Sequence, residues 1–161
     1  MKTQSKILGL AAVALFGVQG AAHAATASAS ASAAVLSPIA VTKTADLAFG
    51  TVIPSAAAST VTMTGAGTFT CGSGLTCSGT HNAAGFSISG TDGSAVTISS
   101  DPSVTLTSGS YSMSANLTPS VASLTLTSGA GSFNVGGVLA VGASQAAGTY
   151  AGTFNVTVNY Q

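Results

Sequence analysis

The segment Thr149–Gln161 reads TYAGTFNVTVNYQ, and its side chains alternate between two kinds without a break. One face carries Tyr150, Gly152, Phe154, Val156, Val158 and Tyr160. The other face carries Thr, Ala, Asn and Gln. A period of two is typical of a strand with one buried face, and burying Phe154, Val156 and Val158 would contribute roughly 1.5–3 kcal/mol each. The pattern predicts a long final strand that packs its apolar face against a neighbour.

Short runs of the same kind fill the chain before this segment. They cover residues 47–54, 61–64, 86–88, 96–98, 104–106, 124–126 and 133–135. Turn-forming sequences separate them, for example Gly90–Gly93 and Ser128–Gly131. Strands at this spacing, without a long helical stripe among them, indicate an all-β antiparallel sandwich. The same reasoning treats Thr42–Asp46, around Lys43, as a solvated loop.

The composition narrows the class of protein. Of 161 residues 46% are hydrophobic and only 4% are charged, with no Arg, Glu or Trp. Nucleic acids and acidic substrates are bound by clustered cations, so we expect neither as a partner. Disordered chains combine low hydrophobicity with high net charge, and this chain has neither property. The sequence therefore predicts a folded, nearly uncharged, β-rich domain.

Residues 1–24 have the features of a secretory signal peptide. Lys2 and Lys6 precede the apolar run Ile7–Val18, and Ala22–Ala24 fits the small-x-small rule for cleavage. The apolar run is about a dozen residues, short for a membrane-spanning helix, although an uncleaved anchor is the alternative. We expect cleavage between Ala24 and Ala25, with export through the periplasm to the cell surface, a fimbrium or the extracellular space.

Cys71 and Cys77 flank a glycine-rich stretch of five residues. In an oxidising compartment such a pair predicts a disulfide, which would stabilise the fold by roughly 2 kcal/mol on the chain-entropy model. The alternative is a metal or redox pair, but CxxC spacing is absent and His81 is the one histidine after the expected cleavage site.

Residues 25–36 form a candidate extension ahead of the domain at 37–161. Small apolar residues recur with period two, and Ile39 and Val41 continue the same parity. The apolar positions of the extension are Ala25, Ala27, Ala29, Ala31, Ala33 and Val35. This alternation favours a strand, although an Ala/Ser-rich linker is the alternative for residues 25–34. Pro38 would interrupt a longer strand, so we expect a boundary near Ser37–Pro38.

Candidate catalytic and metal-binding residues are few. Beyond the signal, His81, three aspartates and Lys43 are the charged or titratable groups apart from tyrosine and cysteine. No serine lies in a Gly-x-Ser-x-Gly elbow, and neither a second histidine nor a carboxylate cluster suggests a metal site. We expect no enzyme activity, cofactor, metal or small-molecule substrate. A Lys–Asn crosslink through Lys43 is a further alternative.

Two motifs resemble a known family. LAFGT at 47–51 resembles one half of its signature, and VGGVL at 135–139 with AGTYAGTFNVTVNY at 147–160 resembles the other. Together they are similar to the bacterial secreted family termed domain of unknown function 4402, over nearly all of the mature chain. The closing strand is also similar to that of chaperone–usher pilins and spore-coat-U-like proteins. That second resemblance implies an immunoglobulin-like sandwich that lacks its final strand.

The resemblance implies a structural subunit of a fimbria or pilus that polymerises by donor-strand complementation. A periplasmic chaperone and an outer-membrane usher would be partners, and copies would join head to tail. Residues 25–35 would form the donor strand. Tyr150, Phe154, Val156, Val158 and Tyr160 would line the strand that a chaperone or donor pairs with. The alternatives are a secreted surface or biofilm-matrix sandwich closed by its own N-terminal strand, and, more remotely, a small outer-membrane β-barrel.

Overall fold

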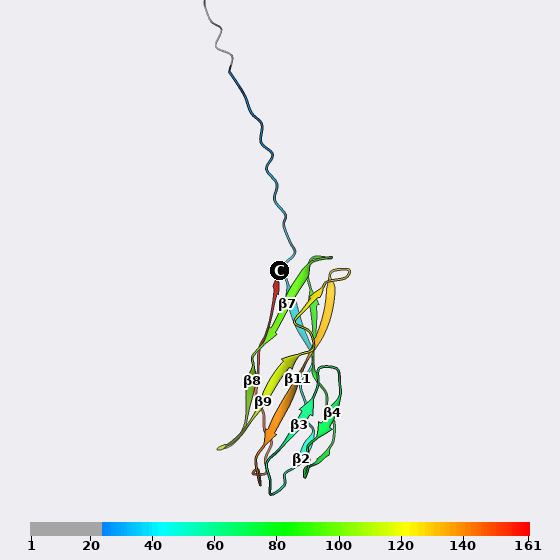
Figure 1. The fold of residues 1–161 in the computed structure, drawn as a ribbon, viewed down its shortest axis with the longest axis vertical. Helices are drawn as coiled ribbons and strands as arrows, with labels where there is room; N and C mark the ends of the chain where they lie inside the picture. The colour runs from blue at the N-terminus through cyan, green and yellow to red at the C-terminus, as the bar shows by residue number, and fades with distance from the viewer. Residues whose placement is uncertain (1–23) are drawn as a thin grey trace, which may run out of the picture. The chain divides into compact units, whose positions relative to one another are not determined.

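The computed structural model describes residues 24–161 (Figure 1). Within this range every regular element is a strand, and no helix is long and apolar enough to cross a membrane. The chain divides into two units, Met1–Ala34 and Val35–Gln161, and the second contains all twelve strands. The predicted signal peptide lies outside the described residues except for Ala24.

The larger sheet has seven antiparallel strands arranged around the longest one, β11 (Ala130–Val141). The first half of β11 pairs with β6 (Ala84–Ser89), and the second half pairs with β3 (Ser59–Met63). On the opposite edge β11 pairs with β9 (Tyr111–Pro119). Three outer strands complete the sheet: β1 (Ala40–Ala45) beside β6, β4 (Phe69–Cys71) beside β3, and β8 (Ser103–Ser108) beside β9.

Two smaller sheets accompany it. The first has the order β10-β7-β12. Its strands are β10 (Ser123–Thr125), β7 (Ala95–Ser100) and the C-terminal β12 (Val156–Tyr160). The second pairs β2 (Thr51–Ile53) with β5 (Thr76–Ser78). All pairings are antiparallel, which confirms the predicted all-β, sandwich-like fold.

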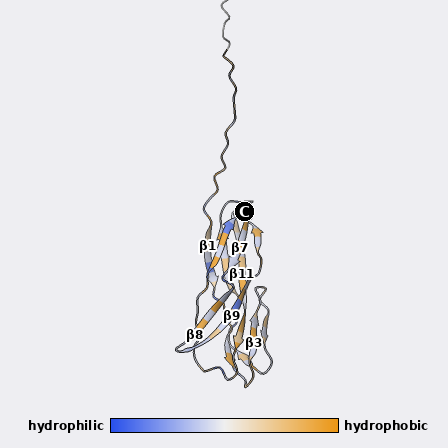
Figure 2. Ribbon diagram, turned by 60° about the vertical axis from the view of Figure 1, so that its left-hand side comes forward, coloured by the Kyte–Doolittle hydropathy of each residue, from blue (hydrophilic) through white to orange (hydrophobic). Residues whose placement is uncertain are grey.

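The hydrophobic core lies between the sheets and comes from alternate residues of the strands. Figure 2 shows hydrophobic residues interspersed with polar ones along the chain. Val61, Val96 and Val135 are fully buried, and they come from β3, β7 and β11. Phe86 of β6 stacks on Phe133 of β11, with 5.2 Å between ring centroids. In β7, Val96 and Ile98 alternate with exposed Thr97 and Ser99, so the period-two pattern places one apolar face of this strand in the core.

The predicted strands at 61–64, 86–88, 96–98, 104–106 and 133–135 correspond to β3, β6, β7, β8 and β11. Two expectations were wrong, and one strand was not predicted. Lys43 lies within β1 and not in a loop, and residues 111–119 form a strand, β9, that the sequence analysis did not predict. The predicted strand over 149–161 is regular only from Val156, because residues 152–155 follow the corner between β7 and β8.

Candidate functional site

Two segments of the chain run past each other without joining into a sheet. One is residues 37–54, which includes β1 and β2; the other is the C-terminal segment, residues 149–161, which includes β12 (coloured red in Figure 1). Among the described residues no backbone hydrogen bond or strand pairing links these two segments. We call the space between them the acceptor groove.

One end of the acceptor groove is closed by the side chain of Tyr160. Its hydroxyl accepts a hydrogen bond from the Thr91 N–H (2.7 Å) and donates one to the Ser37 carbonyl (2.7 Å). The Ser37 N–H in turn donates to the Thr91 hydroxyl, also at 2.7 Å. Because a phenol ring spans the gap here, the Ser37 and Tyr160 backbones stay apart without a direct hydrogen bond.

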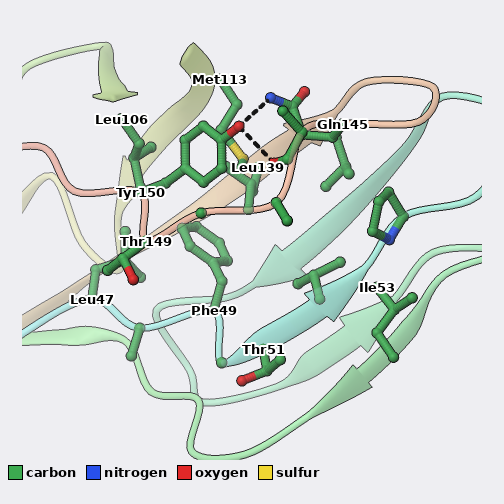
Figure 3. A pocket seen from close by; sticks show the side chains of 18 of the residues that line it. Leu47, Phe49, Thr51, Ile53, Leu106, Met113, Leu139, Gln145, Thr149 and Tyr150 are labelled. Carbon is green, nitrogen blue, oxygen red and sulfur yellow. Dashed lines mark hydrogen bonds between the residues drawn. The ribbon is translucent and has the colours of Figure 1, made fainter. Parts of the chain in front are cut away.

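The other end of the acceptor groove opens into a pocket of about 780 Å³ (Figure 3). Residues 47–54 and 145–150 form its two walls. Between the walls lie the apolar side chains of Leu106, Met113, Leu139 and Val141. The Tyr150 hydroxyl donates to the Ala146 carbonyl (2.8 Å) and accepts from the Gln145 amide (2.8 Å). This pair of bonds holds the Tyr150 ring against the pocket.

Inward-facing side chains are less buried in β12, next to the acceptor groove, than in β7. In β7, Val96 is fully buried and Ile98 is 5% exposed. In the adjacent β12, Val156 and Val158 belong to the same inward face but are only partly buried. On the other side of the groove Val41 of β1 is 36% exposed. Since β12 pairs only with β7, and β1 only with β6, among the described strands, each presents one unpaired backbone edge.

The C-terminal segment is fixed in place from the opposite side. Ala151 exchanges two backbone hydrogen bonds with Thr107 of β8, at 2.9 and 3.1 Å. Asn155 donates through its backbone N–H (2.8 Å) and its side-chain amide (3.2 Å) to the Asp101 carboxylate. A single segment therefore crosses from β8 to β7, and within it β12 keeps one unpaired backbone edge.

The disulfide between Cys71 and Cys77 is confirmed, with 6.0 Å between the two Cα atoms. Cys71 belongs to β4 of the large sheet, and Cys77 belongs to β5, which pairs with β2. Because β2 supplies part of one wall of the pocket, the disulfide ties that wall to the large sheet.

The remaining predicted residues lie as follows. Residues 24–34 are exposed and have no strand partner, so the strand predicted there from the alternation is not formed within this chain. Tyr150, Phe154, Val156, Val158 and Tyr160 all lie along the acceptor groove side of the C-terminal segment and are partly buried. Val35 is 93% exposed.

In the part of the chain that the structure describes, the titratable groups do not converge on a reactive centre. His81 is exposed and stacks on Phe69, with 3.8 Å between ring centroids. The Lys43 ammonium lies 2.6 Å from the Asp46 carboxylate at the surface. Residues 24–161 contain no group of three or more His, Cys, Asp or Glu side chains able to hold a metal ion.

The pocket combines residues that no local pattern in the sequence connects. Leu106 was part of a predicted strand, but Met113 lies in the unpredicted β9, and Gln145 lies in a loop. These residues are far apart in the sequence and converge only through the pairing of β8, β9 and β11. The signals for the pocket in the sequence were the motif at 47–51, which lines one wall, and residues 147–150 of the closing motif, which line the other.

The described residues form an all-β, sandwich-like domain with a pocket between residues 47–54 and 145–150. Residues 39–160 match the family model described as a domain of unknown function, DUF4402. The chain belongs to this family, and the match begins after the exposed N-terminal extension. No curated protein is significantly similar to the chain.

Removing the Tyr160 hydroxyl tests how one end of the groove is held. Tyr160→Phe leaves the Thr91 N–H, in a partly buried setting, and the exposed Ser37 carbonyl without this partner. We expect the free energy of unfolding to fall by about 1–3 kcal/mol, measured by denaturant unfolding of the full domain. Tyr111→Phe is the control, because Tyr111 is 56% exposed and we expect no measurable change there.

Proposed function

We propose that this protein is a structural subunit of a bacterial surface fimbria that polymerises by donor-strand complementation. The observation that carries the proposal is the acceptor groove, which has an unpaired edge on both sides and a half-buried apolar face. The exposed N-terminal extension, residues 25–36, supplies a strand of matching chemistry.

Unpaired strand edges attract other strands, and most folds protect them. An extended peptide added at such an edge gains backbone hydrogen bonds, while its alternate side chains determine register. The extension alternates Ala with Ser or Thr over residues 25–33. One face of it would therefore meet the apolar face of the C-terminal segment while the other stays in water.

The proposal includes export and assembly partners. The chain would leave the cytoplasm by its signal peptide and reach the surface through the periplasm. A periplasmic chaperone would cover the acceptor groove until an outer-membrane usher delivers the next subunit. The function proposed is structural and non-enzymatic, and the recognised partner is another copy of the same chain.

An unboiled denaturing gel of material sheared from the cell surface tests the proposal. We expect the full mature protein to give a ladder of detergent-resistant multimers, and a variant lacking Ala25–Ala34 to give none. A matched control keeps residues 25–34 in number and composition but scrambles their order, which removes the alternation. We expect the scrambled variant to lose the ladder as well.

A single monomer band from the full mature protein would contradict the proposal. It would favour the alternative of a surface or matrix protein whose sandwich is closed within one chain. A ladder that survives the deletion would instead show that multimers form without the extension.

A further inference from the structure

Resting on the proposed function, we infer that Ser37, Thr91 and Tyr160 form a clamp that carries tension from the N-terminal extension into the domain. In a fibre held together by exchanged extensions, tension would reach each domain through the residue where its extension begins. That residue is Ser37, because among the described residues before β1 it is the one that forms hydrogen bonds. We call these three residues the Ser37 clamp.

The Ser37 clamp is a closed cycle of three hydrogen bonds. The Ser37 N–H donates to the Thr91 hydroxyl, and the Ser37 carbonyl accepts from the Tyr160 hydroxyl, both at 2.7 Å. The Thr91 N–H donates to the same phenol oxygen, also at 2.7 Å. Both backbone groups of Ser37 are therefore used, by two partners that are also bonded to each other. Since the first residues of a domain are poorly ordered unless they are tied down, this cycle fixes the point where the folded domain begins.

Each partner of Ser37 is held in the fold by bonds of its own. Tyr160 ends β12, which pairs with β7 of the small sheet. Thr91 lies in the turn between β6 and β7, and the Gly90 N–H of this turn donates to the Gly129 carbonyl (2.9 Å), just before β11 of the large sheet. A force applied at Ser37 would therefore pass into the small sheet through Tyr160 and toward the large sheet through Thr91.

The fold leaves room for the Tyr160 hydroxyl at the centre of the clamp. A Cβ on Gly90 would lie 2.5 Å from this oxygen and 2.9 Å from a methyl group of Leu126. A glycine at position 90 therefore keeps open the space in which the phenol meets Thr91 and Ser37. Any larger residue there would push the phenol out of the cycle.

Without the clamp, tension from the extension would act on β1 alone. Among the described strands β1 pairs only with β6, and five of its six residues are exposed, so little side-chain packing holds it. A strand pulled from one end loses its backbone hydrogen bonds one after another, because the bond nearest the pull takes most of the force. Only Pro38 and Ile39 separate Ser37 from β1. The clamp bonds must therefore break before β1 can peel away.

Unfolding of the single mature chain at constant force, along two pulling axes, tests the clamp. On the first axis the handles are attached to the two ends of the chain, so the force separates Ser37 from Tyr160. On the second axis they are attached through Ala66→Cys and Ser110→Cys, in two exposed turns outside the clamp. The native cysteines are already joined to each other, which leaves the two added thiols for the handles.

Two variants remove parts of the clamp. Thr91→Val keeps the shape of the side chain but removes the hydroxyl that binds the Ser37 N–H, and Tyr160→Phe removes the other two bonds. We expect Thr91→Val to raise the unfolding rate on the first axis about two- to tenfold, and Tyr160→Phe to raise it more. On the second axis we expect no change, because interactions that are still formed when the domain yields do not alter the unfolding rate.

The matched controls make the same chemical changes outside the clamp. Thr105→Val and Tyr111→Phe alter exposed side chains of β8 and β9. We expect neither variant to change the unfolding rate on the first axis.

Equal increases of the unfolding rate on the two axes would overturn the inference, because the three residues would then contribute only to general stability. An unchanged rate on the first axis would also overturn it, because the clamp would then carry no tension. Neither result depends on multimers, so the unboiled gel tests the proposed function separately. A rate increase confined to the first axis, in a protein that forms no ladder, would support the clamp and contradict the proposed function.

Discussion

Replacing Ala29 and Ala31 together by aspartate is expected to abolish the ladder of detergent-resistant multimers. In the proposed assembly the two carboxylates would lie on the face of the extension that meets the apolar face of the C-terminal segment. Burying an ionised carboxylate in an apolar site without a partner costs several kcal/mol per group. The described chain offers no free cation near the groove to offset this cost, since Lys43 pairs with Asp46 at the surface. The measurement is the unboiled gel of surface-sheared protein.

The matched control places the same charges on the other face of the same strand. Ser28→Asp with Ser30→Asp adds two aspartates to the extension, but these side chains would point into water. We expect this variant to keep the ladder. Both variants should unfold at the same denaturant concentration as the wild-type monomer, because residues 24–34 are exposed and unpaired in the single chain. Normal multimers from the Ala29/Ala31 variant would contradict strand exchange through this face.

The fold could be predicted from the sequence where one face of a strand is buried. In β7, Val96 and Ile98 are buried between exposed Thr97 and Ser99, so alternation in the sequence matches alternation in burial. The same agreement holds for β3 and for Phe133 and Val135 of β11. At these positions the hydrophobic effect determines which side of the strand faces inward.

The strands that were not predicted are those whose side chains are mostly exposed. β1 is exposed on both faces over most of its length, so Lys43 is tolerated in it and no apolar alternation distinguishes it from a loop. In β9 the first four residues are exposed or partly exposed, and Ala115 is the first buried side chain. Backbone pairing holds β1 against β6 and β9 against β8. The side-chain pattern does not reveal these backbone pairings.

The two segments that border the candidate site could be predicted, and the pocket between them could not. The apolar face of residues 150–160 is a local pattern of period two. The pocket combines Leu106 of β8, Met113 of β9 and Leu139 of β11, which the sheet topology brings together. The departure of residues 152–155 from regular strand geometry also depends on tertiary contacts, because the Asp101 carboxylate holds Asn155 at the corner.

Gly136→Ala is expected to cause a large loss of stability. Gly136 lies where β11 changes partner, between Val135, opposite Ala84 of β6, and Gly137, opposite Met63 of β3. A Cβ at this position would clash with the Met63 carbonyl oxygen and would lie 2.5 Å from the Gly65 nitrogen. Both are backbone atoms, so relief requires the end of β3 to move away from β11. We expect the free energy of unfolding to fall by about 3 kcal/mol.

Gly131→Ala in the same strand is the control for this prediction. A Cβ there would approach side-chain methyl groups of Leu124 (2.8 Å) and Leu126 (3.0 Å), which can rotate away. We expect a loss of about 1 kcal/mol or less, because replacing glycine also lowers the conformational entropy of the unfolded chain. Denaturant unfolding of the two variants and the wild type measures the difference. A small domain has only about 5–15 kcal/mol of total stability, so the Gly136 variant should unfold at a clearly lower denaturant concentration. Equal losses for the two variants would show that β3 does not closely approach β11 at Gly136.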